Sequence, residues 1–281
     1  MSQRWSYMIR SIEQRNSMKI DRVIFCLNDN PTYTGFWNSF SRVWKQKYDI
    51  HPTVMFVGTE DALKRSNLSQ QWGDIIRLEP VEECIVDPRQ DWSVTWAMFF
   101  GASLFENEVC VTMGIDQIPL SNAFFDFLLK AEELDNDKYV VALSGAYQQY
   151  NMSHYPSAWH IAKGSVFKKI LQIDSDWEKE VKKVFASRNK YATLPENFWA
   201  LDECYSSDMI QQYAAKQENN EIRLMPRFYQ DYWNPRRVDR NKRMQYDINL
   251  LQAGEYTELH APRPFDANKE YILKLIEDLL G

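Results

Sequence analysis

The segment VCVTMGIDQIPLS, residues 109–121, decides the expected fold. Its first five residues are apolar except for one threonine, and such a short apolar run predicts a strand buried in a sheet. Gly114 and then the carboxylate of Asp116 follow this run. A buried strand that ends on a single acid places that acid at the rim of the sheet, where it can meet a ligand or cap a following helix.

Similar apolar runs alternate with helical patterns along the first half of the chain. Strands are expected over residues 21–27, 52–58, 74–80 and 138–145, and helices over residues 36–44, 60–64, 91–105 and 122–133, with Asp91 as an N-cap. This alternation predicts βαβ units, and hence an α/β fold with a mostly parallel, mixed sheet flanked by helices. The loops at residues 28–34, 114–119 and 145–157 should then share one edge of the sheet.

The second half is less regular. A strand, a glycine break and a helix are expected within residues 157–171, a strand at residues 220–227, and helices at residues 174–185, 195–216 and 266–280. Ser175 and Glu178 form a capping box for the first of these three helices, and Pro195 lies in the first turn of the second. Since no repeat or break in composition divides the chain, residues 1–281 are interpreted as a single domain.

The composition is that of a soluble globular protein, with 44% hydrophobic and 26% charged residues. A formal net charge of −6 argues against a nucleic-acid partner, because binding to phosphates needs a basic surface. The four cysteines lack C-x-x-C spacing, which favours core residues over a zinc site or a disulfide framework. Without a secretory or membrane-spanning run, a cytoplasmic location is expected. Residues 4–15 are amphipathic and fit either a helix packed on its own domain or a peripheral contact with the cytoplasmic face of a membrane.

The segment GIDQIPL, residues 114–120, resembles the metal-binding motif DxDxxPL of nucleotide-sugar-dependent glycosyltransferases with the GT-A fold. The second acid, the proline and the leucine match, while Gly114 stands in place of the first acid. Four further stretches resemble parts of that fold in the same order: VIFCLNDNPTYTGFWNSFSRVW, SAWHIAKGSVFKKIL, FWALDECY and ELHAPRPF. The resemblance spans most of the chain in short pieces and implies transfer of a sugar from a nucleotide-diphosphate donor to a hydroxyl of a glycan acceptor.

The resemblance also implies that the two halves of the chain bind different substrates. About residues 20–145 form the nucleotide-binding half of the GT-A-like domain, and about residues 146–281 form the acceptor-binding half. The implied nucleotide contacts are Asn28, Asp29, Asn30, Thr34 and Ile115. From the residues alone, the Asn-Asp-Asn-Pro stretch is equally well explained as a βα turn, because these residue types favour turns.

A metal site is implied at Asp116 and His260. Hard cations such as Mn²⁺ or Mg²⁺ bind carboxylates and share their coordination shell with phosphates, and imidazole is a good ligand for Mn²⁺. Residue types alone leave other roles open, namely a helix cap or Asx-turn for Asp116 and a backbone-bonded loop histidine for His260. The glycine at position 114 leaves metal dependence open as well.

Asp202 and Glu203 are candidates for the catalytic base that inversion requires. Adjacent positions on a helix point in different directions, so only one is expected to face a given site. The resemblance favours Asp202, with Glu203 second, and slightly favours inversion over retention. The alternative is a solvated acidic pair near a helix start, which the helix dipole stabilises.

Basic and aromatic residues cluster within residues 223–243. We assign Arg236, Arg237 and Arg240, together with Arg263, to the donor diphosphate, and expect arginine to carry some of the charge usually left to a cation. A solvated loop and an RNA-binding surface are the alternatives for this cluster.

The stretch GAYQQYNMSHYPSAW is the candidate acceptor site, because aromatic faces stack on sugars and polar groups bind sugar rims. Its candidate residues are Tyr147, Tyr150, His154, Tyr155 and Trp159. The same aromatics could simply pack the loop down. Two other functions remain open: a non-catalytic module with a decayed motif, and a sugar-nucleotide-forming transferase, although the turn after the first strand lacks the glycine-rich basic loop of the latter.

Overall fold

The structure is a computed structural model of the chain. It describes residues 19–87, 91–122, 125, 137–191, 199–216, 221–225, 237–240 and 245–281. The predicted amphipathic pattern of residues 4–15, nearly all of the predicted helix at residues 122–133 and the predicted helix start at Pro195 lie outside these residues.

The strands of the main sheet are β1 (Arg22–Leu27), β2 (His51–Val57), β3 (Asp74–Leu78), β4 (Val109–Thr112), β6 (Tyr139–Val141), β7 (His160–Lys163) and β8 (Ile222–Leu224). In the described part of the chain their order is β3-β2-β1-β4-β7-β6-β8. Only β7 runs antiparallel to its neighbours, whereas the remaining pairs in this sheet are parallel. The predicted mixed, mostly parallel sheet is confirmed.

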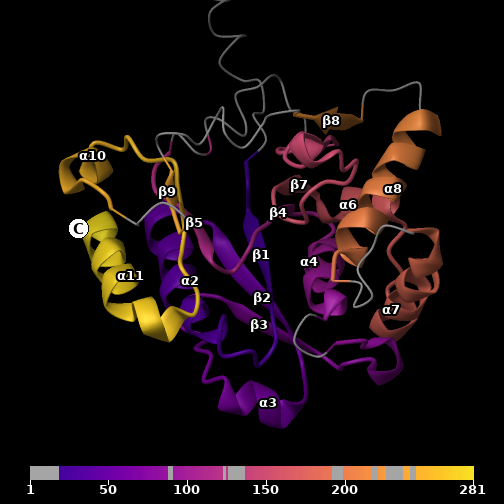
Figure 1. Cartoon of the computed structure of the whole chain (residues 1–281), viewed down its shortest axis with the longest axis horizontal. Helices are drawn as coiled ribbons and strands as arrows, with labels where there is room; N and C mark the ends of the chain where they lie inside the picture. The colour runs from indigo at the N-terminus through magenta and orange to yellow at the C-terminus, as the bar shows by residue number, and fades with distance from the viewer. Residues whose placement is uncertain are drawn as a thin grey trace, which may run out of the picture.

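Helices cover both faces of this sheet (Figure 1). They are α2 (Thr34–Tyr48), α3 (Glu60–Arg65), α4 (Trp92–Leu104), α6 (Gly164–Leu171), α7 (Trp177–Ala186), α8 (Leu201–Lys216), α10 (Ile248–Gln252) and α11 (Phe265–Leu280), with single 3₁₀ turns at Glu82–Cys84, Gln148–Tyr150 and Arg188–Lys190. Residues of α2 and α11 pack in the core on one face, and residues of α4, α6 and α8 pack in the core on the other. The predicted α/β class is therefore confirmed.

The sequence of β1 explains why the sheet has two cores. Val23 and Phe25 point into the core beneath α2, while Ile24 and Cys26 point into the core beneath α4. Side chains alternate between the two faces of a strand, so a strand buried on both faces must be apolar throughout. Residues 23–27 of β1 form an unbroken apolar run that meets this requirement, and all six residues of the strand, including Arg22 at its start, are buried.

Close packing of α4 onto the sheet depends on Gly101. A Cβ atom at this position would lie 2.5 Å from Cγ of Met55 and 3.1 Å from a methyl of Ile24. Any larger residue would push the helix away from β1 and β2. The helix itself begins as predicted, because the Asp91 side chain accepts a hydrogen bond from the backbone N–H of Ser93.

The cap of α7 differs from the prediction by one residue. Asp176, rather than Ser175, is the N-cap, and its side chain accepts from the backbone N–H of Lys179. Asp and Ser are equally good caps, so a sequence such as DSDW offers two adjacent starts that local preference cannot separate.

A second sheet of three short strands lies beside the first in the described part of the chain. It consists of β5 (Gln117–Pro119), β9 (Val238–Asp239) and β10 (Glu258–His260), in the order β5-β10-β9. The register pairs His260 with Gln117 on one side and with Asp239 on the other. This sheet brings the last part of the chain next to the turn that follows β4.

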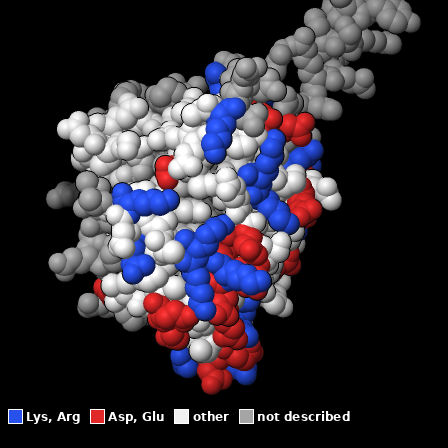
Figure 2. All heavy atoms as spheres, turned by 90° about the vertical axis from the view of Figure 1, so that its right-hand side faces the viewer, with Lys and Arg blue, Asp and Glu red and all other residues white. Residues whose placement is uncertain are grey.

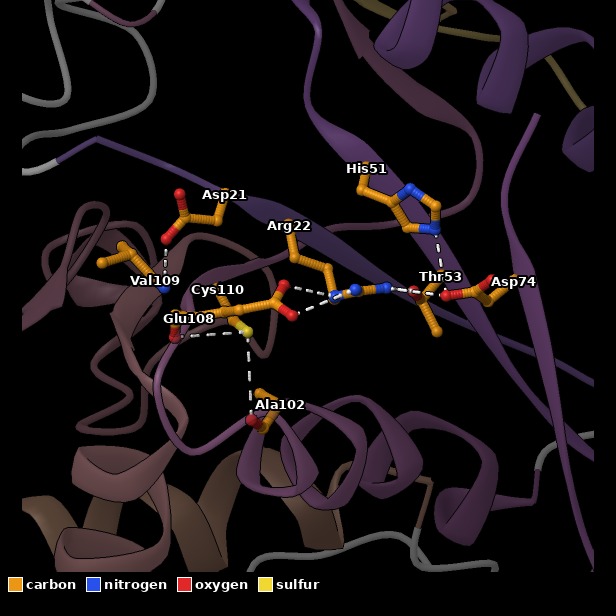
Figure 3. Close-up of polar contacts among 9 residues, drawn as sticks. All are labelled: Asp21, Arg22, His51, Thr53, Asp74, Ala102, Glu108, Val109 and Cys110. Atoms are coloured by element: carbon orange, nitrogen blue, oxygen red, sulfur yellow. Dashed lines mark hydrogen bonds and ion pairs between the residues drawn. The ribbon is translucent and has the colours of Figure 1, made fainter.

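Arg22 joins the starts of several strands at the edge of the sheet where β1 begins (Figure 3). Its guanidinium donates to Glu108 at 2.7 Å, to the Thr53 hydroxyl at 2.6 Å and to Asp74 at 2.9 Å. The guanidinium also lies 3.9 Å from the ring centre of Phe105. A buried cation with this many partners fixes the relative positions of β1, β2 and β3, and of the turn that enters β4.

Acidic and basic side chains intermingle on the face of the molecule that includes α7 and α8 (Figure 2). Lys182 of α7, for example, pairs with Glu178 one turn earlier and with Glu83 at 2.8 Å. Among the described residues, no helix combines the length and apolar character needed to cross a bilayer.

The early helix α2 and the late helix α11 meet in one of the two cores. Phe265, at the start of α11, packs edge-on against Phe36 of α2, with ring centres 5.1 Å apart. Gly35 makes room for this contact, because a Cβ atom there would lie 2.3 Å from the Phe265 ring. The interpretation of residues 1–281 as a single domain stays a prediction.

Candidate functional site

The segments that follow β1, β4 and β6 lie at one edge of the main sheet, as expected for strands of the same direction. Met113 extends β4, and its backbone N–H donates to the carbonyl of Ile24 in β1 at 3.0 Å. The Thr112 hydroxyl donates to the carbonyl of Ser157 at 2.7 Å, which ties the end of β4 to the loop between β6 and β7. Candidate residues from distant parts of the sequence are therefore carried to one region.

Two backbone hydrogen bonds fix the position of Asp116, one within the turn that contains it and one to its own carbonyl. A tight turn after β4 is closed by the bond from Gln117 N–H to the Gly114 carbonyl at 3.0 Å. The backbone N–H of Ala261 donates to the Asp116 carbonyl at 2.8 Å, directly after β10. These bonds fix the Asp116 side chain, which is about one-tenth exposed, at the junction of the two sheets.

Three nitrogen-bearing side chains converge on one oxygen of Asp116. Arg240 Nη1 lies 3.0 Å from Oδ2, Arg263 Nε lies 3.2 Å from it, and His260 Nε2 lies 3.4 Å from it. The structure therefore brings together the two residues predicted as metal ligands. Two of the arginines that were predicted to bind the diphosphate, Arg240 and Arg263, contact the same carboxylate.

Arg263 links Asp116 to the turn after β1. Its Nη1 donates to the Tyr33 hydroxyl in a short contact, and its guanidinium lies 5.1 Å from the centre of the Tyr33 ring. The backbone N–H of Phe265 donates to the carbonyl of Thr32 at 3.3 Å. The arginine is thus fixed from two directions, by a carboxylate and by an aromatic face.

The turn after β1 is shaped by its own asparagines. Asn28 accepts from the backbone N–H of Asn30 at 3.1 Å, and Asn30 accepts from that of Thr32 at 3.0 Å. These are the Asx-turn bonds that the turn interpretation requires. Asp29 is about half exposed and pairs with Arg65 at 3.3 Å, Thr34 is the first residue of α2, and Ile115 is buried. Nucleotide contacts from these residues stay a prediction.

The donor set around Asp116 fits a divalent cation poorly. Among the described residues, no three His, Cys, Asp or Glu side chains form a group that could hold a metal ion. The Asp116 oxygen that lies nearest His260 already receives two guanidinium groups. A metal ion binds such an oxygen at about 2.1 Å, which would place it beside two fixed positive charges.

Gly114 stands where the first acid of the resembled motif would be. A Cβ atom at position 114 would lie 3.1 Å from Oδ1 of Asp116 and 3.2 Å from Oε1 of Gln117. A side chain there would therefore point at the carboxylate, as the first acid of the resembled motif would have to do. The Oε1 atom of Gln117 is buried and has no hydrogen-bond partner in the described part of the chain.

Arg237 lies in a different setting from the other arginines. Its side chain is only 3% exposed, and its Nε lies 2.8 Å from Glu258 and 3.3 Å from Asp239. Burial raises the pKa of Glu258 to about 7, and the charge of Arg237 opposes this rise. Arg237 is thus a buried residue whose ion pairs join β9, through Asp239, to β10, through Glu258. The predicted diphosphate ligand Arg236 lies outside the described residues.

A second cluster forms around Ser157, in the loop between β6 and β7. The Ser157 hydroxyl donates to Asp202 in a short contact, and the Ser157 backbone N–H donates to Oε1 of Glu203 at 3.4 Å. Both acids are buried in the first turn of α8. Ser157 contacts both acids, Asp202 with its hydroxyl and Glu203 with its backbone N–H, and the expectation that only one of them faces a substrate stays a prediction.

Both carboxyl groups of this pair favour the protonated form more than usual. Burial is the main cause for each. It raises the pKa of Asp202, although the hydrogen bond from Ser157 lowers that pKa in part. It also raises the pKa of Glu203, which the nearby charge of Asp202 raises further. Burial also lowers the pKa of His154, whose Nε2 lies 3.5 Å from Oε2 of Glu203. A carboxyl group poised in this way can exchange a proton near neutral pH.

Glu203 is better placed than Asp202 to meet a substrate. Its Oε1 accepts from the Tyr147 hydroxyl at 3.0 Å, and its Oε2 is a buried atom with no hydrogen-bond partner among the described residues. A buried acceptor without a donor is costly unless a ligand or water supplies one. Asp202, in contrast, is engaged by the Ser157 hydroxyl and by Thr95.

The predicted acceptor residues divide into three groups. Tyr147 and His154 lie beside Glu203, with their ring centres 5.0 Å apart. Tyr150 is 63% exposed on the loop. Tyr155 and Trp159 are buried in the core, and Trp159 has a positive φ of 75°, which is rare for a bulky residue. Contact of these residues with an acceptor stays a prediction.

The charged groups of both clusters, Asp116 in one and Asp202 in the other, affect the pKa of the same residue. Cys26, near the end of β1, has its pKa raised by burial and then by the charges of Asp202 and Asp116. The carboxylates of Asp202 and Asp116 are therefore both near Cys26, at the end of β1. Two contributors, Ser157 and Tyr33, were not predicted; a serine and a tyrosine in turn-rich stretches carry no distinguishing local pattern.

Comparisons with known proteins were made with the sequence and with the fold. No family model matches the chain, and no curated protein matches it. Among solved structures, it is similar to the galactosyltransferase LgtC in complex with donor and acceptor sugar analogues, with 12% identity, a TM-score of 0.47, and coverage of 91% of this chain and 95% of that one. An active-site mutant of LgtC is similar with 12% identity, a TM-score of 0.45, and coverage of 85% and 86%.

Proposed function

We propose that the protein is a glycosyltransferase that moves a sugar from a nucleotide-diphosphate donor to a hydroxyl group of a glycan acceptor. The observation that carries this proposal is the pairing of two unlike clusters at one edge of the sheet. One cluster, around Asp116, carries arginines suited to phosphate. The other, around Ser157, carries a buried carboxyl pair suited to proton transfer.

The donor is proposed to lie across the ends of β1 and β4. Its nucleotide would contact the turn of residues 28–34, where the resemblance puts it, and its diphosphate would face Arg240 and Arg263. Both arginine side chains are about one-quarter to one-third exposed, at 25% and 30%. Positive charge at the diphosphate stabilises the leaving group as the bond to the sugar breaks.

The acceptor is proposed to lie beside Tyr147, His154 and Glu203. Its hydroxyl oxygen attacks the anomeric carbon of the donor sugar, and the bond from that carbon to the diphosphate oxygen breaks. The electron pair of that bond leaves with the nucleoside diphosphate, and the hydroxyl proton passes to a carboxylate. We assign this role to Glu203, with Asp202 as the alternative, because the buried Oε2 atom of Glu203 makes no hydrogen bond among the described residues and has only His154 Nε2, at 3.5 Å, as an ion-pair neighbour.

The test is release of nucleoside diphosphate from UDP-, GDP- and dTDP-sugars, with water and then mixed oligosaccharides as acceptors. Release from one donor, its increase by an acceptor and its loss in Glu203→Gln would support the proposal. Arg42→Ala is the matched control, since Arg42 pairs with Glu277 and Gln46 between α2 and α11. If a donor binds but is never cleaved under any condition, the non-catalytic module becomes the better interpretation.

A further inference from the structure

The arginines around Asp116 bear on how a diphosphate would be held. We propose that Arg240 and Arg263, rather than a divalent cation, bind the donor diphosphate, and that Asp116 serves to hold the two arginines in place. The inference rests on the proposed function and specifies its donor site. It differs from the metal site that the resemblance implies at Asp116 and His260.

The charge balance of the cluster favours an anion. Arginine stays protonated at every pH that a folded protein experiences, so Arg240 and Arg263 contribute two positive charges against one negative charge of Asp116. Among these three side chains the positive charge exceeds the negative charge by one, while the nearby carboxylates of Asp239 and Glu258 pair with the buried Arg237. A diphosphate meets that charge favourably, whereas a second cation would meet repulsion.

Both guanidinium groups are fixed before any ligand arrives. Arg240 is held by Asp116 and by its own backbone N–H, which donates to the carbonyl of His260 at 3.0 Å. Arg263 is held by Asp116 through Nε and by Tyr33 through Nη1. A guanidinium carries N–H donors beyond those that such contacts use, and the exposed part of each side chain can present them to phosphate oxygens. Groups that are already ordered lose little entropy on binding.

The glycine at position 114 fits the same scheme. A metal ion in this position would need a second carboxylate to offset the arginines, and the backbone of residue 114 is the place from which a side chain would reach Asp116. With glycine there, Asp116 is the single acid beside Arg240 and Arg263 in the described contacts. One carboxylate is enough to order two arginines and too little to hold a divalent cation beside them.

The experiment measures the affinity of the full chain for UDP, GDP, dTDP and inorganic pyrophosphate by calorimetry, once with EDTA and once with Mn²⁺ or Mg²⁺. We expect at least one nucleoside diphosphate to bind in EDTA, with less than about a threefold change on adding metal. That is well below the tenfold change that roughly 1.4 kcal/mol produces. Pyrophosphate should bind more weakly, and also in EDTA.

Three variants assign the binding. Arg240→Ala and Arg263→Ala should each weaken the affinity in EDTA by roughly tenfold or more, because each removes a charged hydrogen-bonding group from the anion. Arg263→Lys should recover only part of the loss, since lysine keeps the charge but not the planar fork. Arg42→Ala should leave the affinity unchanged.

The outcomes separate this inference from the proposed function. Binding and cleavage of a donor only when metal is added would overturn the inference and leave the glycosyltransferase proposal standing. Arginine-dependent binding of pyrophosphate in EDTA, with no nucleotide or donor bound, would support the anion site and overturn the glycosyltransferase proposal. No binding of any of these anions under any condition, with all proteins folded by circular dichroism, would overturn both.

Discussion

The Nε atom of Arg263 lies 3.2 Å from the carboxylate of Asp116 and completes a contact between the end of β4 and the segment before α11. The same guanidinium reaches Tyr33 in the turn after β1. One side chain thus connects the three segments to which the sequence resemblance assigns nucleotide, metal and late-chain roles. Predictions about the donor site therefore depend on this contact more than on any single strand.

Replacing Gly114 with aspartate should create a metal response. The new carboxylate would lie beside Oδ1 of Asp116, because a Cβ atom at position 114 already approaches that oxygen to 3.1 Å. Without metal, repulsion between the two acids should lower Tm; Mn²⁺ should restore it in the variant and leave the wild type unchanged. Gly114→Asn has nearly the same shape without the charge and should show no restoration. A rise in the wild-type Tm with Mn²⁺ alone would contradict the expectation.

Replacing Glu203 with glutamine should stabilise the fold while removing activity. Burial raises the pKa of Glu203, so its contribution to the free energy of unfolding is largest at acidic pH and falls as pH rises through that raised pKa. Glutamine removes this dependence and should raise the free energy of unfolding at pH 8 by at least about 1.4 kcal/mol, the equivalent of a single unit of pKa. Urea unfolding at pH 5 and pH 8 measures the effect, and the gain should be smaller at pH 5. A loss of stability at pH 8 would show that the ionised carboxylate is needed by the fold.

Replacing Tyr147 with phenylalanine should move the pH dependence of the reaction. The Tyr147 hydroxyl donates to Glu203 at 3.0 Å, and this bond lowers the pKa of that acid. Without it the pKa rises further, so the rising limb of kcat/KM should move to higher pH by about one unit, the equivalent of one charged hydrogen bond. Tyr150→Phe on the same loop should leave the limb in place, because Tyr150 is 63% exposed. An unmoved limb in Tyr147→Phe would argue against Glu203 as the base.

Replacing Arg22 with methionine should reduce stability without altering the donor site. Removing the cation leaves Glu108 and Asp74 without a shared partner, and because these carboxylates are 37% and 52% exposed we expect a loss of about 1–2 kcal/mol. Chemical denaturation should show the loss. Nucleotide affinity, measured below the new melting range, should match the wild type, since Arg22 lies at the opposite end of β1 from the turn of residues 28–34.

The centre of the main sheet could be predicted from the sequence because strands such as β1, β2 and β4 are buried on both faces. A strand such as β1 must be apolar without interruption, and that pattern is visible in any single sequence. The second sheet could not be predicted. Its strands are two or three residues long and pair across distant parts of the chain, as the register of His260 with Gln117 shows. Such strands are determined by tertiary contacts and carry no periodic signal of their own.

The candidate site divides in the same way. Asp116 and His260 could be matched because a motif and an irregular segment drew attention to them, and the structure places them 3.4 Å apart. Ser157 could not be found, because its importance comes from lying between Asp202 and Glu203 after the loop has folded. The arginines were predicted as one group of diphosphate ligands. The sequence does not show that Arg237 is buried whereas Arg240 is partly exposed.

The contact between Asp116 and Arg240 spans 124 residues of sequence. A ribosome therefore finishes β4 long before it makes the cations that surround this acid. Until the later segment has been made and β10 pairs with β5, Asp116 lacks the arginines of the proposed anion site. The proposed anion site is therefore complete only after Arg263 has been synthesised, well after β4.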